Sequence, residues 1–271
     1  LDIVGAAYVR DIEPGELIAI DESGLRTRTF AAPTPKHCLF EYVYLARPDT
    51  KLGGHSVHAV RVEVGRQLAR EHPVVADMVI PVPESGTPAA VGYAQQSGIP
   101  FAQGLVKNAY VGRTFIQPSQ TLRQLGIRLK LNPLKEEIAG KNLVVVDDSI
   151  VRGTTSVKIV QMMREAGARE VHFRISSPPI TNPDYYGIDT PQKDKLLAAT
   201  HSLEEMRAYI GCDSLAFLSV DGIYRAVGYE RRDPLRPQFT DHCFTGDYPT
   251  NLTDVRGETP RQQLSLLAET G

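Results

Sequence analysis

The segment with the clearest chemical potential is 144–156, which reads VVVDDSIVRGTTS. Two carboxylates, Asp147 and Asp148, follow an apolar β-branched run that is typical of a strand buried on both faces. Neighbouring side chains of a strand point to opposite faces, so paired glycosidase chemistry by these two residues alone is disfavoured. Each carboxylate can instead accept a hydrogen bond from a vicinal diol or hold the hydration shell of a magnesium ion.

Residues suited to binding a phosphate group follow the two carboxylates. Gly153 after Arg152 permits a turn, and Thr154 and Thr155 add hydroxyl groups at the start of a predicted helix, where backbone N–H groups attract anions. Taken singly, these features are better explained by a solvated turn or an ordinary N-cap. In this order, a diol site followed by a phosphate site predicts a ribose 5-phosphate ligand.

Alternating strands and helices position this segment. Apolar runs predict strands at 76–81, 143–146 and 170–176, and apolar residues at helical spacing predict helices between them. The first helix is predicted by Val57, Val60, Val64 and Leu68 and ends before Pro73. The second has Thr87 as N-cap, Pro88 as first residue and Gly98 as its end. The third has the apolar face Ile159, Met162, Met163 and Ala166 and ends at Gly167, and a capping box from Ser202 to Glu205 begins the fourth. This alternation predicts an α/β fold with a parallel sheet flanked by helices on both faces, and ligands then bind beyond the carboxyl ends of the strands.

The two ends of the chain differ from this pattern. Turn signals at 13–16 and 23–24 break residues 1–36 into short segments, which predicts a small sheet followed by a linker. Beyond about Tyr229 the composition is polar and typical of loops. We therefore expect an N-terminal β segment at 1–36, a central domain at 37–230 and a C-terminal extension at 231–271. Because the chain starts at Leu1 without a methionine, we also expect a piece of a longer protein.

Composition excludes several classes of protein. Of 271 residues, 30 are Lys or Arg and 32 are Asp or Glu, a net charge of −2 that argues against a nucleic-acid partner. No apolar run is long enough to span a membrane. Three widely spaced cysteines, Cys38, Cys212 and Cys243, cannot form a complete disulfide framework. We expect a cytoplasmic globular protein with reduced thiols.

The 144–156 segment resembles the phosphoribosyl pyrophosphate motif of type I phosphoribosyltransferases. Its sequence is similar to the form of this motif in the amidophosphoribosyltransferase family. Five further segments carry the same resemblance: 40–49, 83–86, 107–116, 186–189 and 246–249. The resemblance implies the type I phosphoribosyltransferase fold with a C-terminal hood. It also implies transfer of ammonia, normally channelled from glutamine, to phosphoribosyl pyrophosphate, which gives 5-phosphoribosylamine and pyrophosphate in the first committed step of purine biosynthesis.

The resemblance further implies roles for particular residues. Asp147 and Asp148 would bind the ribose hydroxyls and assist Mg²⁺, and 83–87 would bind pyrophosphate. The implied substrate-binding residues are Glu84, Ser85, Gly86, Thr87, Ser149, Arg152, Gly153, Thr154, Thr155 and Ser156. Relatives often carry a magnesium-binding Ser or Thr near Gly86, which has no side chain here; Ser85, Thr87 or water are the alternatives. Lys107 and Arg113 would close over the substrate, a role that suits two cations flanking a hinge glycine.

Two features depart from the family pattern. The glutamine-hydrolysing domain begins with a cysteine nucleophile, and residues 1–36 resemble only that domain's final stretch, so we expect activity with ammonia and none with glutamine. Some relatives hold a 4Fe–4S cluster on four cysteines; Cys38 and Cys243 occupy two of those positions, whereas Asp184 and Thr240 occupy the others. Two thiolates cannot replace four, so we expect no iron–sulfur cluster.

The family also implies purine nucleotide feedback inhibitors and a homo-oligomer. Two other functions remain open. A non-catalytic regulator that binds phosphoribosyl pyrophosphate would need a DNA-reading module and a basic face, and the sequence has neither a helix-turn-helix pattern nor a net positive charge. A nucleobase salvage transferase would keep the fold and change the acceptor, but the segments 107–116 and 200–271 resemble the amidotransferase family instead.

Overall fold

The computed structural model describes residues 4–110 and 130–252, and the chain divides into two compact units, Leu1–His37 and Cys38–Gly271. In the first unit, β1 (Glu16–Asp21) and β2 (Gly24–Thr29) form the antiparallel hairpin that the turn signals predict. No helix of the described residues is long and apolar enough to cross a membrane.

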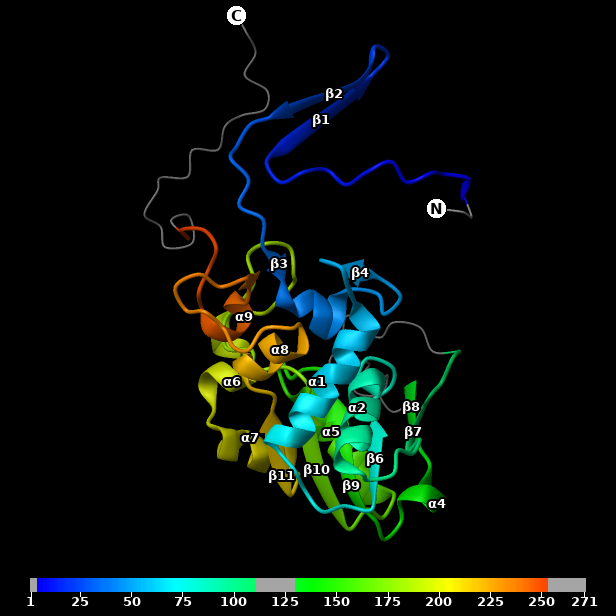
Figure 1. Ribbon diagram of the computed structural model, residues 1–271. Helices are drawn as coiled ribbons and strands as arrows, with labels where there is room; N and C mark the ends of the chain where they lie inside the picture. Colours follow the sequence, from blue (N-terminus) through cyan, green and yellow to red (C-terminus); the bar gives the residue numbers. More distant parts are fainter. Residues whose placement is uncertain (1–3, 111–129, 253–271) are drawn as a thin grey trace, which may run out of the picture. The chain divides into compact units, whose positions relative to one another are not determined.

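A parallel four-stranded sheet is the centre of the second unit (Figure 1). Its order is β11-β10-β9-β6, from Ser214–Phe217, Glu170–Ile175, Asn142–Asp147 and Met78–Pro81. In its register Pro81 pairs with Val146 and Ile175 pairs with Asp147, so the carboxyl ends of the three strands β6, β9 and β10 lie side by side. The expected parallel sheet is confirmed.

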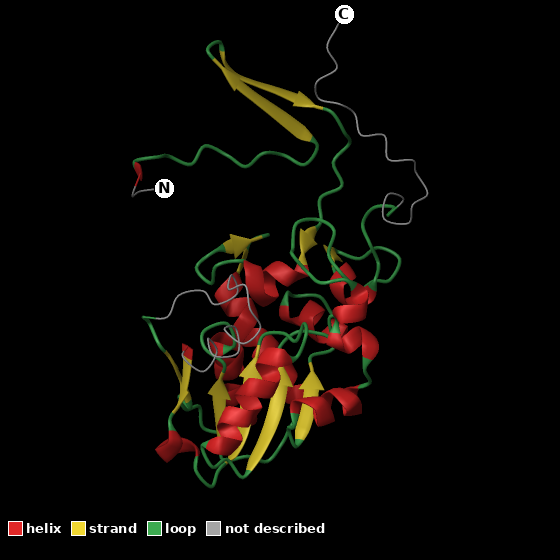
Figure 2. Ribbon diagram, turned by 180° about the vertical axis from the view of Figure 1, so that it is seen from behind, coloured by secondary structure: helices red, strands yellow, loops and turns green. Residues whose placement is uncertain are grey.

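Helices cover both faces of this sheet, as the alternation predicts (Figures 1 and 2). Val144 and Val146 join an apolar cluster with α1 (Val57–Glu71), α2 (Thr87–Ser97) and α8 (Val220–Ala226). The alternate residues Leu143 and Val145 join a second cluster with α5 (Thr154–Glu165) and α7 (Leu203–Ile210). Because successive side chains of β9 point to opposite faces of the sheet, this one strand contributes residues to both apolar clusters.

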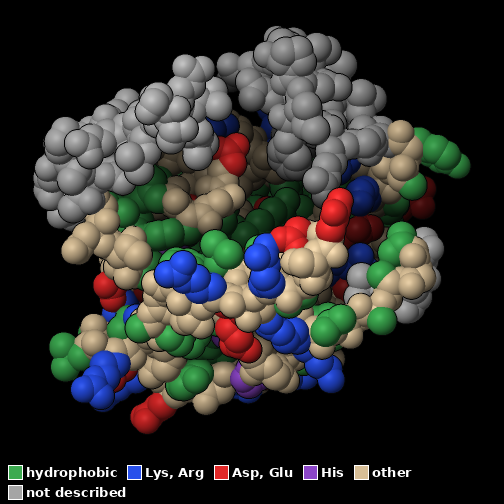
Figure 3. Space-filling view, turned by 90° about the horizontal axis from the view of Figure 1, so that it is seen from above, with side chains coloured by type: hydrophobic (Ala, Val, Ile, Leu, Met, Phe, Trp, Pro, Cys, Tyr) green, Lys and Arg blue, Asp and Glu red, His purple; other side chains and the backbone are tan. Residues whose placement is uncertain are grey.

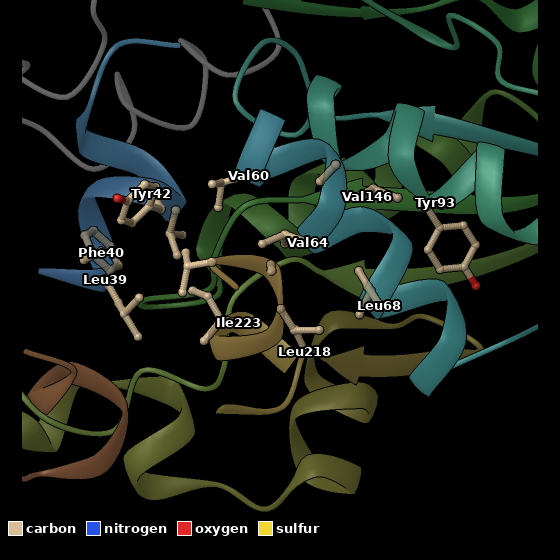
Figure 4. Packing of buried hydrophobic residues seen from close by; sticks show 14 of the residues in the cluster. Leu39, Phe40, Tyr42, Val60, Val64, Leu68, Tyr93, Val146, Leu218 and Ile223 are labelled. Carbon is tan, nitrogen blue, oxygen red and sulfur yellow. The ribbon is translucent and has the colours of Figure 1, made fainter. Parts of the chain in front are cut away.

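Helix α1 presents Val60, Val64 and Leu68 to the first cluster, where they face Leu218 and Ile223 (Figure 4). Ser56 caps the helix by accepting a hydrogen bond from the Ala59 amide at 3.3 Å. The predicted capping box at Ser202 and Glu205 is also present and begins α7.

The start of α2 differs from the prediction by one position. Gly86 is the N-cap and Thr87 is the first helical residue, so the Thr87 side chain does not cap the helix. The helix does stop at Gly98, which has a left-handed φ of 75°. The shift arises because 82–86 folds back on itself, with the Gly86 amide donating to the Val82 carbonyl at 3.0 Å.

Short elements complete the fold. They are β3 (His37–Cys38), the π-helix η2 (Glu41–Leu45), β4 (Lys51–Leu52), β5 (His55–Ser56), β7 (Leu105–Lys107), β8 (Leu131–Pro133), α4 (Lys135–Ile138), the 3₁₀ helix η4 (Lys193–Lys195), α6 (Leu197–Thr200), β12 (Phe239–Thr240) and α9 (His242–Thr245). The last two lie in the segment that its polar composition marks as loop. Phe239, Cys243 and Phe244 are buried in the first cluster, and this packing outweighs local composition.

Helices α1 and α2 approach so closely that two contact positions admit only glycine. A Cβ atom on Gly92 would lie 1.8 Å from the Val62 carbonyl oxygen, and one on Gly65 would lie 1.9 Å from the Ala89 carbonyl oxygen. Neither glycine has a positive φ, so the constraint is space between two backbones and not backbone conformation.

We therefore predict that Gly92→Ala destabilises the chain by about 1–3 kcal/mol through overpacking. The higher helix propensity of alanine, about 1 kcal/mol, acts in the opposite direction. Urea denaturation followed by circular dichroism measures the change, with Gln96→Ala at an exposed position of the same helix as the control. A midpoint for Gly92→Ala equal to or above that of the control would refute the packing argument.

Candidate functional site

Two of the predicted site segments meet because they follow neighbouring parallel strands. The 82–86 loop follows β6 and the 148–153 loop follows β9. The Val82 amide donates a hydrogen bond to the Val146 carbonyl at 2.8 Å, which fixes the start of the first loop against the end of β9. The site therefore lies at the carboxyl edge of the sheet, where α/β proteins place their ligands.

Asp147 and Asp148 are buried side by side, with exposed fractions of 6% and 7%. The Asp147 carboxylate accepts a hydrogen bond from the Asp148 amide at 2.9 Å. Asp148 accepts from the hydroxyl of Ser149, and its side chain is also hydrogen-bonded to Ser85. The two carboxylates are therefore held by different partners, as expected for neighbouring residues at a strand end.

Burial raises the pKa of both carboxyl groups. For Asp147, which is raised well above its ordinary value, the negative charge of Asp148 adds to the effect of burial. For Asp148, hydrogen bonds from Ser149 and Ser85 and the positive charge of Arg61 oppose burial and lower the pKa. A cation bound here would neutralise two closely spaced acidic groups, and a hydroxyl-bearing ligand would donate hydrogen bonds to them.

Sequence analysis did not identify Arg61, a buried charge near the acidic pair that acts on Asp148. It is buried on α1, and its guanidinium donates to the backbone carbonyls of Tyr42 at 2.7 Å and Ala46 at 2.8 Å. The available signal was its position four residues after Val57, on the apolar stripe of the helix, where a charged residue needs a partner.

Gly86 fits its position because no side chain has room there. A Cβ atom would lie 2.4 Å from the Val146 carbonyl oxygen and 3.0 Å from the Val82 carbonyl oxygen. The neighbouring Ser85 is instead hydrogen-bonded to Asp148. Of the three alternatives for the missing magnesium ligand, this geometry favours Ser85 over Thr87, the first residue of α2.

A glycine turn starts α5 in the segment for which the sequence predicts phosphate binding. Gly153 has a φ of 75°, and a Cβ atom on it would lie 2.6 Å from the Leu197 side chain, so both conformation and space require glycine. As the N-cap it has no side chain to satisfy the first N–H groups of the helix. These groups can bind an anion.

Side chains around this turn are mostly open to solvent. Arg152, Thr154 and Thr155 are exposed, whereas Ser156 is buried on the helix. Exposed hydroxyl and guanidinium groups beside an uncapped helix start are the components of a phosphate site.

Lys107 reaches the first loop from the end of β7. Its Nζ lies 3.3 Å from an Oε of Glu84, whose side chain is 76% exposed. Strand β7 pairs with β8, and Lys107 lies opposite Leu131, so the two strands flank residues 108–130 in the sequence. Arg113, the second predicted clamp cation, lies outside the described residues.

Comparison with known proteins places this geometry in a family. Residues 65–177 match the model of the phosphoribosyl transferase domain. The amidophosphoribosyltransferase of Rhizobium etli is 58% identical over 278 residues, covering 100% of this chain and 56% of the relative. That of Mycobacterium tuberculosis is 62% identical over 257 residues, covering 93% and 48% respectively. The chain thus spans about half the length of the curated relatives that it matches.

A solved structure supports the same relationship. The glutamine phosphoribosylpyrophosphate amidotransferase of Bacillus subtilis, in complex with ADP and GMP, is 50% identical with a TM-score of 0.79, covering 92% of this chain and 55% of its own. Strands β6, β9 and β10 and the two loops at their carboxyl ends lie within residues 65–177, which match the family model. The chain belongs to the amidophosphoribosyltransferase family, and it carries that family's type I phosphoribosyltransferase domain.

Proposed function

We propose that this chain transfers ammonia to phosphoribosyl pyrophosphate, forming 5-phosphoribosylamine and pyrophosphate in purine biosynthesis. The observation that carries the proposal is the pair of buried carboxyl groups, Asp147 and Asp148, between a tight loop and an uncapped helix start. This order matches the order of groups in the substrate: pyrophosphate, ribose diol and 5-phosphate. The names of the relatives support the same substrate and product.

In this proposal each part of the substrate has its own residues. Asp147 and Asp148 accept hydrogen bonds from the ribose hydroxyls, and the turn at Arg152–Ser156, together with Ser149, binds the 5-phosphate. The loop of Glu84, Ser85, Gly86 and Thr87 receives the pyrophosphate. Lys107 then exchanges its exposed ion pair with Glu84 for the more highly charged pyrophosphate, and Arg113 is proposed to act with it.

The residues at the site fit a magnesium ion. Its oxygen ligands would come from Asp148, Asp147 and Ser85, with water completing the shell, because Gly86 can offer no side chain. When bound, Mg²⁺ neutralises charge on the pyrophosphate group.

The reaction follows from charge and position. The lone pair of ammonia forms a bond to the anomeric carbon while the bond from that carbon to the pyrophosphate oxygen breaks, and its electrons leave with pyrophosphate. The new amine releases one proton, which pyrophosphate or water accepts, so no enzyme base is needed. The chain orients the ribose through its carboxylates and stabilises the departing charge through Lys107.

We further propose the partners and setting of the reaction. Residues 1–36 belong to the end of a glutamine-hydrolysing domain, which is supported by the exposed apolar side chains Leu17, Ile20, Leu25 and Phe30 of the hairpin unit. Residues 37–230 are the transferase domain and 231–271 its extension. The chain forms a homo-oligomer that purine nucleotides inhibit. The complex of the Bacillus subtilis enzyme with ADP and GMP supports the nucleotide-binding part of this proposal. The three free cysteines are in keeping with the reducing cytoplasm.

Two other functions share part of this site. A regulator would bind phosphoribosyl pyrophosphate without turnover, and a salvage transferase would use a nucleobase as acceptor. On the described part of the face in Figure 3, Lys and Arg side chains are interspersed with Asp and Glu, which gives no support to a DNA-binding regulator. We retain both functions as outcomes of the following assay.

We predict that the chain releases pyrophosphate from phosphoribosyl pyrophosphate with ammonium salts and with neither free purines nor pyrimidines. Because neutral ammonia is the nucleophile, the rate should rise between neutral and mildly alkaline pH. A coupled pyrophosphate assay with each acceptor and with none measures this. Turnover with a nucleobase would establish salvage, and tight binding without turnover would establish a regulator.

We predict that Asp147→Asn combined with Asp148→Asn reduces this turnover by at least about 1000-fold, because the substrate diol and Mg²⁺ lose both carboxylates. The ammonium-dependent assay measures the loss. Undiminished turnover by the folded double variant would exclude the assigned role.

The same variant should not lose stability. Because both pKa values are raised in the native state, the native chain holds these protons more tightly than the unfolded chain above about pH 4. The free energy of unfolding of the wild type therefore falls as pH rises through the raised pKa values of the two carboxyl groups. The asparagine variant has no such groups and should not show this fall. Urea unfolding from about pH 4 upward, compared between the two proteins, is the control for folding.

We predict that Ser85→Ala raises the KM for magnesium phosphoribosyl pyrophosphate by about tenfold or more, the expected effect of losing one hydrogen bond to a charged group. Ser97→Ala, at the far end of α2, is the matched control and should leave KM unchanged. Equal KM values for the two variants would show that Ser85 contributes nothing to metal or substrate binding.

A further inference from the structure

Away from the transferase site, three potential metal ligands meet in the interior. One carboxylate oxygen of Asp184, one ring nitrogen of His242 and the sulfur of Cys243 all lie within 4.8 Å of one another. Their residues are only 8%, 2% and 2% exposed. The cluster joins the 181–188 loop to α9, and the Cys243 carbonyl accepts hydrogen bonds from the amides of Thr181 and Asn182 at 3.0 and 3.1 Å.

Cys38 stands beside this cluster. It ends β3, which pairs with β12, and its side chain is hydrogen-bonded to Thr240 of that strand. Burial, and after it the neighbouring Cys38 thiol, raise the pKa of Cys243 to about 12. The charge of Asp184 acts on both thiols. The three-residue cluster therefore has a second sulfur next to it.

An iron–sulfur cluster does not fit these residues. Of the four positions that the family resemblance assigns to it, Thr240 offers no thiolate, and Asp184 already accepts hydrogen bonds at Oδ1 from the amides of Tyr186 at 2.7 Å and Ile188 at 2.9 Å. Only Oδ2 of Asp184 remains for a metal. The donors that can reach a single ion are one oxygen of Asp184, one nitrogen of His242 and the sulfur of Cys243, with the Cys38 sulfur beside them.

His242 is incompletely satisfied by protein groups. Its Nε2 lies 2.7 Å from Oδ2 of Asp184, whereas its buried Nδ1 has no hydrogen-bond partner among the described residues. The ring is held in place by the rings of Tyr186 and Tyr248, each with its centroid 5.1 Å away. These rings hold Nε2 of His242 beside Oδ2 of Asp184, so that both atoms can bind one ion once the proton between them is displaced.

We propose that Cys38, Asp184, His242 and Cys243 bind one divalent d-block cation, for which Zn²⁺ is the best match. Mixed sulfur, nitrogen and oxygen ligands suit tetrahedral zinc, which has no geometric preference of its own. Bond lengths of about 2.0–2.3 Å require ligand atoms about 3.3–3.8 Å apart. Displacing the proton between Oδ2 of Asp184 and Nε2 of His242 lets these two atoms move from 2.7 Å apart to this separation. Cys38 lies outside the set of atoms within 4.8 Å of one another and would move in as the fourth ligand.

The site would act as a structural clasp. Its ligands come from three parts of the chain, at residue 38, residue 184 and residues 242–243, which no disulfide connects, since all three cysteines are free. Closing these long loops with one ion restricts the unfolded chain. The clasp does not include any residue assigned to substrate binding, so metal loss should reduce stability and spare the transferase groups.

The test is metal binding by the whole chain. Protein purified without chelators is analysed for zinc, iron and acid-labile sulfide, then stripped and titrated with Co²⁺. We expect about one zinc per chain without sulfide, and a thiolate-to-cobalt charge-transfer absorption on titration. A folded wild-type chain that binds neither Zn²⁺ nor Co²⁺ would overturn the proposal, and about four iron and four sulfide per chain would replace it with a 4Fe–4S cluster.

Matched variants assign the ligands. Cys243→Ser should weaken cobalt binding by about tenfold or more, whereas Cys212→Ser, which removes an equally buried thiol from the other apolar cluster, should leave it unchanged. Equal binding by the two variants would disprove the site. If Cys243→Ser does not fold, Asp184→Asn replaces it, and the wild-type titration remains decisive alone.

Discussion

The site depends on the burial of two adjacent acidic groups at the end of one strand. Like charges in a poorly solvated place repel each other and resist ionisation, and the raised pKa values of Asp147 and Asp148 express this. The surroundings offset part of the cost through hydroxyl groups and through the charge of Arg61, carried on α1. A bound cation and diol would offset the remainder, so the cost of burying two acidic groups is also the basis of the proposed affinity.

Close approach between backbones is the second constraint, and it explains why glycines occur where they do. Gly86 lies against the Val146 carbonyl, and Gly153 combines a positive φ with contact to Leu197. Gly86 thus brings the first loop against the end of β9, and Gly153 brings the start of α5 against Leu197. Substitution at either would move a loop away from the acidic pair, although neither glycine offers a functional group of its own.

The C-terminal segment shows how tertiary contacts give a polar sequence a fixed structure. The buried carboxylate of Asp241 accepts hydrogen bonds from the Tyr224 hydroxyl at 2.8 Å and from the Arg232 guanidinium. Together with the Asp184 and His242 pair, this network holds β12 and α9 against the core. The proposed zinc ion would reinforce a region whose local composition is typical of loops.

Local patterning in the sequence determined the parallel sheet, the helices on its two faces and the identity of the strand-end segment, because period-two and helical spacing need no knowledge of distant residues. It also indicated the order of carboxylates, glycine and hydroxyls from which a ribose phosphate ligand follows. Only the tertiary structure decided that the charge of Arg61 acts on Asp148, that Ser85 contacts Asp148, and that His242 joins Asp184 and Cys243. These are contacts between segments far apart in the chain, and a single sequence carries no signal of which buried polar groups will become neighbours.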